Sequence, residues 1–404
     1  MRRPTVLRAI LIASCLLLSQ TTALLGQRDL RELRDRAEEG NPAAQFNLAR
    51  LYVSGTGVPQ DDLEAVRWYR LAADQGHTAA QHNLGLRYDL GSGVDEDDEE
   101  AVRWYRLAAD QGHWEAQFRL GRMYADGTGI ERNDAVAVDW YRQAADQGHA
   151  EAQYSLGQMY FNGRGVARNR AEAARWVTRA ARLGNSTAQT PLASMYERGA
   201  GVPVDEALAF RWYHLAAVQG DPAAQVTLGY LYDAGTGVAE DDEEAIRWIR
   251  RAADQSNAEA QFALGNMYLN GRGVASDPSE AVRWTRLAAE QGFPRAQFNL
   301  GMSYDTGTGV EPDSAEAARW FHRAAEQGEA AAQQNLGVMY ANGDGVLRDF
   351  VTAHQWLSLA AVSLEGTSQA TATGYRDIVA QQLSPEQLAE AERRAKEWVR
   401  TPER

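Results

Sequence analysis

The stretch Ala80–Gly112 reads AQHNLGLRYDLGSGVDEDDEEAVRWYRLAADQG and contains every feature that decides the fold. It opens with apolar residues at helical spacing, passes through a Gly-Ser-Gly turn and ends in a second periodic segment rich in alanine. The same pattern returns every 36 residues, without insertion or deletion, in nine units. Three residue types mark the registers: Gln45 to Gln333, Tyr52 to Tyr340 and Trp68 to Trp356. The 404 residues therefore form one repeat array rather than two or three unrelated domains.

Each repeat is predicted to contain two helices, of which the first spans residues 42–54 in the first repeat. Ala44, Leu48 and Tyr52 then lie on one face of a helix with 3.6 residues per turn. The segment Gly55-Thr56-Gly57 follows, and a Gly-x-Gly pair occupies this position in all nine repeats. Because glycine adopts positive φ at little cost, the pair indicates a helix end and a sharp turn. A phosphate-binding loop is disfavoured, since the glycines follow a helix and have no partner lysine.

The second helix of each repeat is predicted to begin at an N-cap residue that is always Asp or Asn. The register holds Asp61, Asp97, Asn133, Asn169, Asp205, Asp241, Asp277, Asp313 and Asp349. Three residues on, six repeats have a glutamate that we expect to complete a capping box: Glu64, Glu100, Glu172, Glu244, Glu280 and Glu316. Their recurrence at helix starts favours capping over general acid–base catalysis.

The body of the second helix is predicted to form the core. Trp68 and the alanines 65, 72 and 73 have counterparts in every repeat, and this spacing favours packing between helices over a ligand-stacking ladder. The helix ends at a glycine, Gly76 in the first repeat, which Ser256 and Leu364 replace in two others. On its outer face we expect surface ion pairs that join Arg67, Arg70, Arg103 and Arg106 to Asp74, Glu99 and Asp110.

Composition excludes several function classes. The chain has 41 Lys+Arg against 55 Asp+Glu, a formal net charge of -14, which argues against nucleic acid as a partner. Lys396 is the one lysine, so Schiff-base chemistry and lysine-dependent phosphate loops are disfavoured. The seven histidines are expected in loops and on outer faces. His77, His113 and His149 share a register, but at about 10 Å per helix pair they lie too far apart for one ion. We predict no metal and no cofactor.

The N-terminal segment has the layout of a secretory signal peptide. Arginines precede a ten-residue apolar run, residues 9–18, and small residues follow, so we assign residues 1–23 to export. The run is too short to span a bilayer comfortably, and no membrane-spanning helix is expected elsewhere. An alternative is a lipobox, in which Cys15 becomes a lipidated N-terminus. Residues 27–40 are expected to form an N-terminal capping helix, residues 41–364 the nine repeats, and residues 365–404 the C-terminal capping helices.

The repeat pattern resembles the Sel-one-like repeat (SLR), a relative of the tetratricopeptide repeat. The motif A-x-x-x-L-G-x-x-Y-x-x-G-x-G-V, followed by D-x-x-x-A-x-x-W-Y-x-x-A-A-x-Q-G, is complete in Ala80–Gly112, and its first half returns in Ala224–Gly237. The resemblance implies an all-α, right-handed superhelical solenoid of helix pairs that acts as an adaptor or scaffold for other proteins. A cysteine-rich secreted branch of the family is linked to penicillin binding. This chain departs from that branch, because its one cysteine lies within the export segment.

The face of the first helix that remains after packing is expected to line the concave side of the superhelix and to bind partners. It corresponds to positions 43, 47, 50 and 54 of the first repeat. The candidate residues are Asn47, Arg50, Asn83, Arg119, Arg122, Gln158, Asn162, Arg198, Tyr230, Asn266, Asn270, Asn299, Asn335 and Asn342. Amide and guanidinium groups in such a row suit the backbone of an extended peptide, although a solvated surface without a ligand is an open alternative.

The sequence thus predicts a non-catalytic interaction scaffold of the cell envelope, periplasmic or secreted, that binds proteins or peptides. Two alternatives stay open. One is a penicillin-interacting, β-lactamase-like hydrolase of the cell wall, by analogy with the cysteine-rich branch. The other is a peptidoglycan-binding module that uses exposed aromatic side chains.

Overall fold

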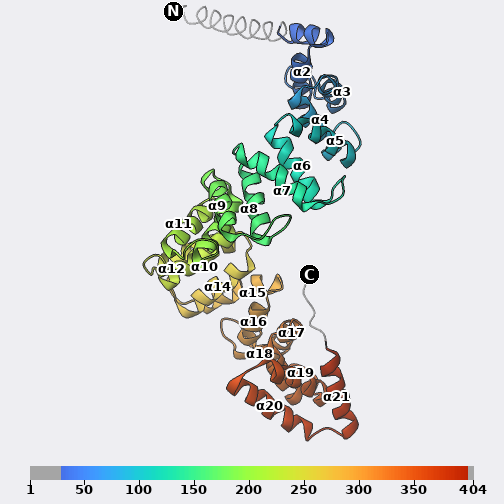
Figure 1. The fold of residues 1–404 in the computed structure, drawn as a ribbon. Helices are drawn as coiled ribbons and strands as arrows, with labels where there is room; N and C mark the ends of the chain where they lie inside the picture. The colour runs from blue at the N-terminus through green and yellow to red at the C-terminus, as the bar shows by residue number, and fades with distance from the viewer. Residues whose placement is uncertain (1–28, 399–404) are drawn as a thin grey trace, which may run out of the picture. The chain divides into compact units, whose positions relative to one another are not determined.

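The computed structural model describes residues 29–398, and the expected signal peptide and Cys15 lie outside this range. Every element of regular secondary structure in the described range is a helix (Figure 1). The chain divides into two compact units, one ending at Pro203 and the other beginning at Val204.

The first unit opens with a helix over residues 29–38, within the range 27–40 that was predicted to form an N-terminal capping helix. Its first helices of the repeats are α2 (Pro42–Ser54), α4 (Thr78–Leu90), α6 (Trp114–Asp126), α8 (Ala150–Asn162) and α10 (Ser186–Arg198). Its second helices are α3 (Asp62–Asp74), α5 (Asp98–Asp110), α7 (Asp134–Asp146) and α9 (Arg170–Arg182). Helices that follow one another from α2 to α10 pack together.

The second unit continues the alternation in the same way. Its second helices are α11 (Glu206–Val218), α13 (Asp242–Asp254), α15 (Pro278–Glu290), α17 (Ser314–Glu326) and α19 (Phe350–Ser363). The first helices are α12 (Pro222–Ala234), α14 (Ala258–Asn270), α16 (Pro294–Thr306), α18 (Ala330–Asn342) and α20 (Gly366–Ala380), and α21 (Pro385–Glu397) ends the unit. Helices that follow one another from α11 to α20 pack together.

The residues that begin and end the helices of the repeats are those predicted. Each first helix of the nine repeats ends at a glycine in the left-handed conformation, such as Gly55 with φ 67°. Each second helix begins at the predicted Asp or Asn, whose side chain accepts backbone N–H groups of the first turn. These contacts satisfy amides that a bare helix end would leave without partners.

The predicted capping boxes in the repeats are wrong in one respect. The N-cap amide already has an acceptor: Asp61 N donates to the Tyr52 carbonyl at 3.0 Å, and Asp97 N to that of Tyr88 at 3.1 Å. The glutamate carboxylates turn instead to an arginine three residues on, as in Glu100–Arg103 at 2.9 Å. The same pairing joins Glu64–Arg67, Glu172–Arg175, Glu244–Arg247, Glu280–Arg283 and Glu316–Arg319.

The predicted partners of the outer-face arginines are therefore also corrected. Arg67 and Arg103 bind the glutamates of the first turn rather than Asp74, Glu99 or Asp110. Arg70 and Arg106 lie over the rings of Tyr88 and Tyr124, at 5.6 and 5.7 Å from the ring centroids. The glutamate in the first turn thus forms an ion pair with the arginine of the next turn. The second arginine stacks on the tyrosine ring of the following repeat.

The recurrent glutamine connects successive repeats inside the core. The Gln81 side chain is 4% exposed, and its Nε2 donates to the Ala73 carbonyl of the preceding repeat at 3.1 Å. Its Oε1 accepts from Gln111 Nε2 at 2.7 Å, at the end of α5. Around these bonds lie the predicted alanines and tryptophans, including Ala73 (1% exposed) and Trp104 (3% exposed). Here the core is therefore a layer of small and aromatic residues crossed by buried amide bonds.

The C-terminal end closes the array differently from an ordinary repeat. Gln369 of α20 keeps the glutamine register, and its Nε2 donates to the Ala361 carbonyl at 3.1 Å. Helix α21 then packs against α19, where Trp398 meets Trp356 with ring centroids 6.4 Å apart. Ser384 and Gln387 form a capping box at the start of α21. In the part of the chain that the structure describes, no helix is long and apolar enough to cross a membrane.

Candidate functional site

A set of hollows lies between successive first helices, with the second helix as the floor. In each case one wall comes from the first helix of one repeat, the other from the next first helix, and the floor from the helix between them. Two of these hollows lie in the first unit and two in the second. We call this surface the first-helix face.

A glycine on the first helix allows the two helices of a repeat to lie in close contact. The second helix can then form the floor of the hollow. A Cβ at Gly229 would lie 2.6 Å from Ile249 Cγ1, and one at Gly265 would lie 2.5 Å from Thr285 Oγ1. Gly229 and Gly265 therefore allow α12 and α14 to lie directly on α13 and α15. This role was not predicted from the sequence, although seven of the nine repeats have a glycine at this register.

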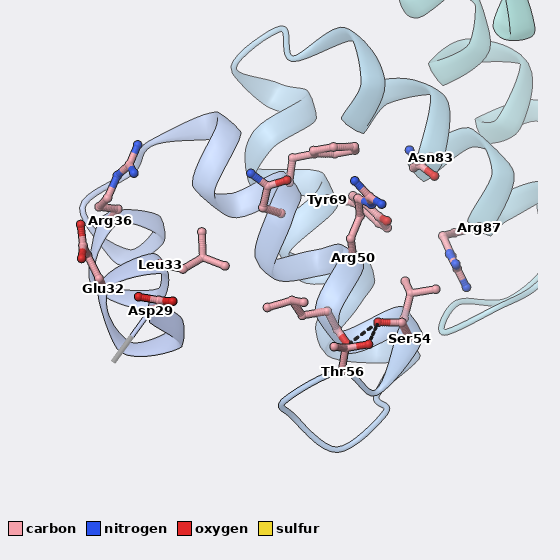
Figure 2. Close-up of a pocket in the computed structure, with 14 residues that line it drawn as sticks. Asp29, Glu32, Leu33, Arg36, Arg50, Ser54, Thr56, Tyr69, Asn83 and Arg87 are labelled. Carbon is pink, nitrogen blue, oxygen red and sulfur yellow. Dashed lines mark hydrogen bonds between the residues drawn. The ribbon is translucent and has the colours of Figure 1, made fainter. Parts of the chain in front are cut away.

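The largest described hollow, about 1190 Å³, lies at the N-terminal end of the first unit (Figure 2). The capping helix supplies Asp29, Glu32 and Arg36 on one side, and α2 and α4 supply Arg50, Asn83 and Arg87 on the other side. Other lining residues include Phe46, Asn47, Ser54, Thr56 and Tyr69. The predicted residues Asn47, Arg50 and Asn83 thus line one hollow.

The charges in this N-terminal hollow are only partly paired. Arg87 binds Asp62 at 3.1 Å, whereas no carboxylate of the described residues is in ion-pair contact with Arg50. Burial raises the pKa of Tyr69, and the positive charges of Arg87 and Arg50 partly offset this rise. The phenol therefore stays protonated and able to donate a hydrogen bond at neutral pH.

The other three hollows are smaller. One of about 160 Å³ between α8 and α10 is lined by the predicted residues Gln158 and Arg198. In the second unit, a hollow of about 170 Å³ between α12 and α14 is lined by Tyr230, Asn266 and Asn270. The next hollow, about 260 Å³ between α14 and α16, is lined by Asn266 and Asn299. Nine of the fourteen predicted residues therefore line described hollows.

The comparisons with known proteins agree with this architecture. The Sel1 repeat model matches residues 42–77, 78–113, 114–149, 150–185, 186–221, 222–257, 258–293, 294–329 and 330–361. The chain belongs to the Sel1 repeat family. The first eight Sel1 repeats run from a first helix to the turn after the second helix and the ninth ends within α19, so the match confirms the predicted nine repeats.

Two solved Sel1 repeat structures are similar over most of the chain. A protective antigen present in uropathogenic Escherichia coli strains, which displays an SLR fold, is 34% identical, with a TM-score of 0.54. The alignment covers 91% of this chain and 94% of the antigen. A Sel1 repeat protein from Oxalobacter formigenes is also 34% identical, with a TM-score of 0.62 over 78% of this chain and 93% of that protein. No curated protein sequence matches the chain.

Five predicted residues of the Sel1 repeats line none of these four hollows. Arg119 and Arg122 reach Asp89 at 3.5 and 3.8 Å, and Arg119 also binds Glu115 at 3.2 Å. Their guanidinium groups thus already have carboxylate partners. The other three are Asn162, which is exposed, Asn335, which donates to Met302 Sδ at 3.3 Å, and Asn342, which donates to Asp344 at 3.0 Å.

The histidines of the Sel1 repeats have two structural roles that were not predicted from the sequence. His77, His113 and His149 cap α4, α6 and α8, each with Nδ1 accepting a backbone N–H at 3.2 Å. His354 is 4% exposed within α19, so the placement of all histidines in loops and on outer faces is wrong. Among residues 29–398 no cluster of three His, Cys, Asp or Glu side chains has the arrangement of a metal site.

Proposed function

We propose that this Sel1 repeat protein is a non-catalytic scaffold of the cell envelope that binds protein or peptide partners on its first-helix face. The observation that carries the proposal is the row of hollows in which an apolar floor is edged by amide and guanidinium groups. Such a surface offers apolar contact to side chains and hydrogen bonds to a peptide backbone.

The cell-envelope location belongs to the same proposal. Its support is the layout of residues 1–23, with arginines before the apolar run and small residues after it. Mass spectrometry of the mature protein tests it: a start near Leu24 is expected. An N-terminus at Met1 in the cell's main pool of the protein would overturn export, whereas a lipidated Cys15 would support export through the lipoprotein route.

Site-specific photocross-linking tests the binding face. A benzophenone amino acid replaces Asn47 or Asn270, which are exposed and line hollows of the first and second units. The matched control replaces Arg103, an exposed residue on the outer face of α5. Partner adducts at Asn47 or Asn270 that exceed those at Arg103 are expected. Adducts of equal yield at all three positions, or at Arg103 alone, would overturn the proposal.

The hydrolase alternative has a direct test of its own. Purified full-length protein is incubated with nitrocefin, and the colour change is followed against buffer. No hydrolysis above buffer is expected, because the proposal assigns no reaction to the first-helix face. Turnover that survives a second purification step would contradict a non-catalytic scaffold.

A further inference from the structure

The tyrosine on the floor of the N-terminal hollow has a hydroxyl group without a partner. Tyr69 of α3 is 2% exposed and lines the hollow, and its Oη forms no hydrogen bond with any described residue. Arg87, on the wall that α4 supplies, has a buried Nε that also lacks a hydrogen-bond partner among the described residues. Because buried polar groups in proteins are nearly always hydrogen-bonded, these unused donors point to a ligand.

The equivalent tyrosine of the next repeat shows what such a hydroxyl binds in this fold. Tyr105 stands at the register of Tyr69, and its Oη donates to Asp89 Oδ2 at 3.0 Å. The same carboxylate oxygen lies 3.5 Å from Arg119 Nη1 and 3.8 Å from Arg122 Nη2. One carboxylate of α4 thus accepts from the floor tyrosine and pairs with two guanidinium groups.

The N-terminal hollow has donors for a carboxylate but no carboxylate of its own at this register. Val53 stands where the next repeat has Asp89, so α2 presents an apolar side chain there. Arg50 and Arg87 line the hollow from other positions of the first helices, and their positive charges act on the Tyr69 phenol. Arg50 forms no ion pair with a described residue. A phenol donor and an unpaired guanidinium are therefore available together.

The charges on the opposite side of the hollow limit how much negative charge can enter. Asp29 and Glu32 lie on the capping-helix side, opposite α2 and α4, and neither forms an ion pair with a described residue (Figure 2). A carboxylate beside Arg50 gains an unpaired cation, whereas a run of acids would also meet Asp29 and Glu32. The hollow therefore suits one acidic side chain with neutral or basic neighbours.

From these observations we infer that the N-terminal hollow binds a partner protein through one aspartate or glutamate side chain, whose neighbours in sequence are neutral or basic. The carboxylate accepts from the Tyr69 hydroxyl and pairs with Arg50, as the carboxylate of Asp89 does with a tyrosine and two arginines in the next repeat. We assign a side chain rather than a chain terminus because Asp89 is itself a side chain of a continuous segment. The inference rests on the proposed scaffold function and names the group that this end of the first-helix face recognises.

Selection from displayed peptide libraries tests which group the hollow recognises. Random peptides fused at both ends, so that they have no free carboxyl terminus, are selected on the full-length protein and in parallel on Arg50→Gln. We expect one aspartate or glutamate, between neutral or basic residues, to be enriched on the wild type and not on the variant. A second library with free carboxyl termini tests the other source of a carboxylate. The inference is overturned if only the second library gives binders that depend on Arg50, or if neither does.

Fluorescence anisotropy with the most enriched peptide then measures each contact. Arg50→Gln, at an exposed position, is expected to weaken binding about tenfold, and Tyr69→Phe severalfold. Val53→Asp places a carboxylate at the register of Asp89, so it should occupy the donors from within and weaken binding at least about tenfold. The control Arg103→Gln removes an exposed arginine from the outer face of α5 and leaves affinity unchanged. Equal affinities of Arg50→Gln and Arg103→Gln would overturn the inference.

Thermal unfolding without any peptide tests the unpartnered hydroxyl itself and shows whether each variant is folded. Tyr69→Phe should leave the melting temperature unchanged, because its hydroxyl has no partner in the protein. Tyr105→Phe should lower it, because the buried Asp89 loses a hydrogen bond. Equal losses for the two variants would show that the Tyr69 hydroxyl is bound within the protein and would overturn the inference.

The outcomes separate this inference from the proposed function. If cross-linking at Asn47 captures a partner while no selected acid depends on Arg50, the carboxylate assignment is wrong and the scaffold function stands. If cross-linking also fails at Asn47 and Asn270, the scaffold function falls with it.

Discussion

Gln81 and Gln111 are 30 residues apart in sequence, yet Gln111 Nε2 donates to Gln81 Oε1 at 2.7 Å. The same bond recurs between Gln75 and Gln45 at 2.8 Å. It returns in the second unit, where Gln255 binds Gln225 at 2.8 Å and Gln291 binds Gln261 at 2.7 Å. A buried amide acceptor is satisfied in each case by the last turn of the second helix, which ties the two helices of the repeat together.

The fourth repeat lacks this glutamine–glutamine bond, so a substitution that restores it should stabilise the protein. Leu183 stands where seven repeats have the donor glutamine, and Gln153 Oε1 is buried without a partner. Leu183 is 58% exposed, so its replacement gives up little apolar burial. We expect Leu183→Gln to supply the missing donor and stabilise the protein by about 1 kcal/mol. Urea unfolding monitored by circular dichroism measures the change.

Leu183→Ala is the matched control for that substitution. It also removes the exposed leucine but has no amide, so it should not gain the stability of Leu183→Gln. The reverse change, Gln111→Leu, should cost about 1–3 kcal/mol because it leaves Gln81 Oε1 buried and unpaired. Equal stability of Leu183→Gln and Leu183→Ala would refute the assignment of Gln153 as an unsatisfied acceptor.

The second glycine of the Gly-x-Gly turn lies against the preceding repeat in every repeat but the first, so Gly93 and Gly57 provide a matched pair. Their φ angles are 77° and 76°. A Cβ on Gly93 would lie 2.2 Å from the Asp62 carbonyl oxygen of the preceding repeat, whereas one on Gly57 would have only Leu30 nearby, at 3.9 Å. We expect Gly57→Ala to cost about 1 kcal/mol, the strain of positive φ alone. Gly93→Ala should cost about 3 kcal/mol, because backbone must also move.

Hydrogen exchange of Gly93→Ala shows which helices lose stability. The amides of α3 and α4 should lose protection together, since the contact joins the turn after α4 to the start of α3. Equal costs for the two alanine variants would mean that the contact between the Gly93 turn and Asp62 does not limit the packing of the repeats.

The helices could be predicted from sequence because their ends depend on local chemistry. Helix α2 spans Pro42–Ser54, as expected, since Gly55 ends it and needs no distant contact to do so. The role of Glu64 could not be predicted in this way. Whether it closes a capping box depends on the Asp61 amide, which the Tyr52 carbonyl occupies only once the turn has folded.

The hollows could be predicted only in part. The polar rim follows from helical periodicity, and Asn266 lies in a hollow as its register suggests. The floor depends on how closely two helices approach, which Gly229 and Ile249 decide together. His113 as an N-cap was missed because histidine is an uncommon cap, although Asn41, Asn185 and Asn257 share its register and give the signal.

We expect a second stabilising substitution at Ser256. It is the one non-glycine residue with positive φ among those described, at 63°, where seven repeats have glycine. Because a side chain is strained in this conformation, Ser256→Gly should stabilise the protein by about 1 kcal/mol. The reciprocal change, Gly76→Ser, should cost a similar amount, since Gly76 has φ 81° and no atom within 4 Å of an added Cβ. Urea unfolding of both variants checks the symmetry, and two changes of the same sign would contradict it.

Because the ring of His82 is largely buried, we expect the first unit to lose free energy of unfolding in acid. Burial above all, and then the nearby charge of His113, lower the pKa of His82 to about 4, although Glu115 opposes the shift. The ring stacks on His113 at 4.6 Å and lies 5.8 Å from Tyr105, and its Nε2 is buried without a partner. The unfolded chain binds this proton near pH 6.5, whereas the folded chain binds it only near pH 4.

Stability from His82 is therefore complete above pH 6.5 and falls as the pH drops toward 4, by up to about 3 kcal/mol. Two other repeats have phenylalanine at this register, Phe46 and Phe118. The variant His82→Phe therefore keeps the ring stacking and removes the imidazole that titrates. Melting temperatures from pH 7.5 to 4.5 should fall more steeply for the wild type than for His82→Phe, because acidic groups such as Glu115 titrate in both. Parallel curves would show that a charged His82 is tolerated in the folded unit.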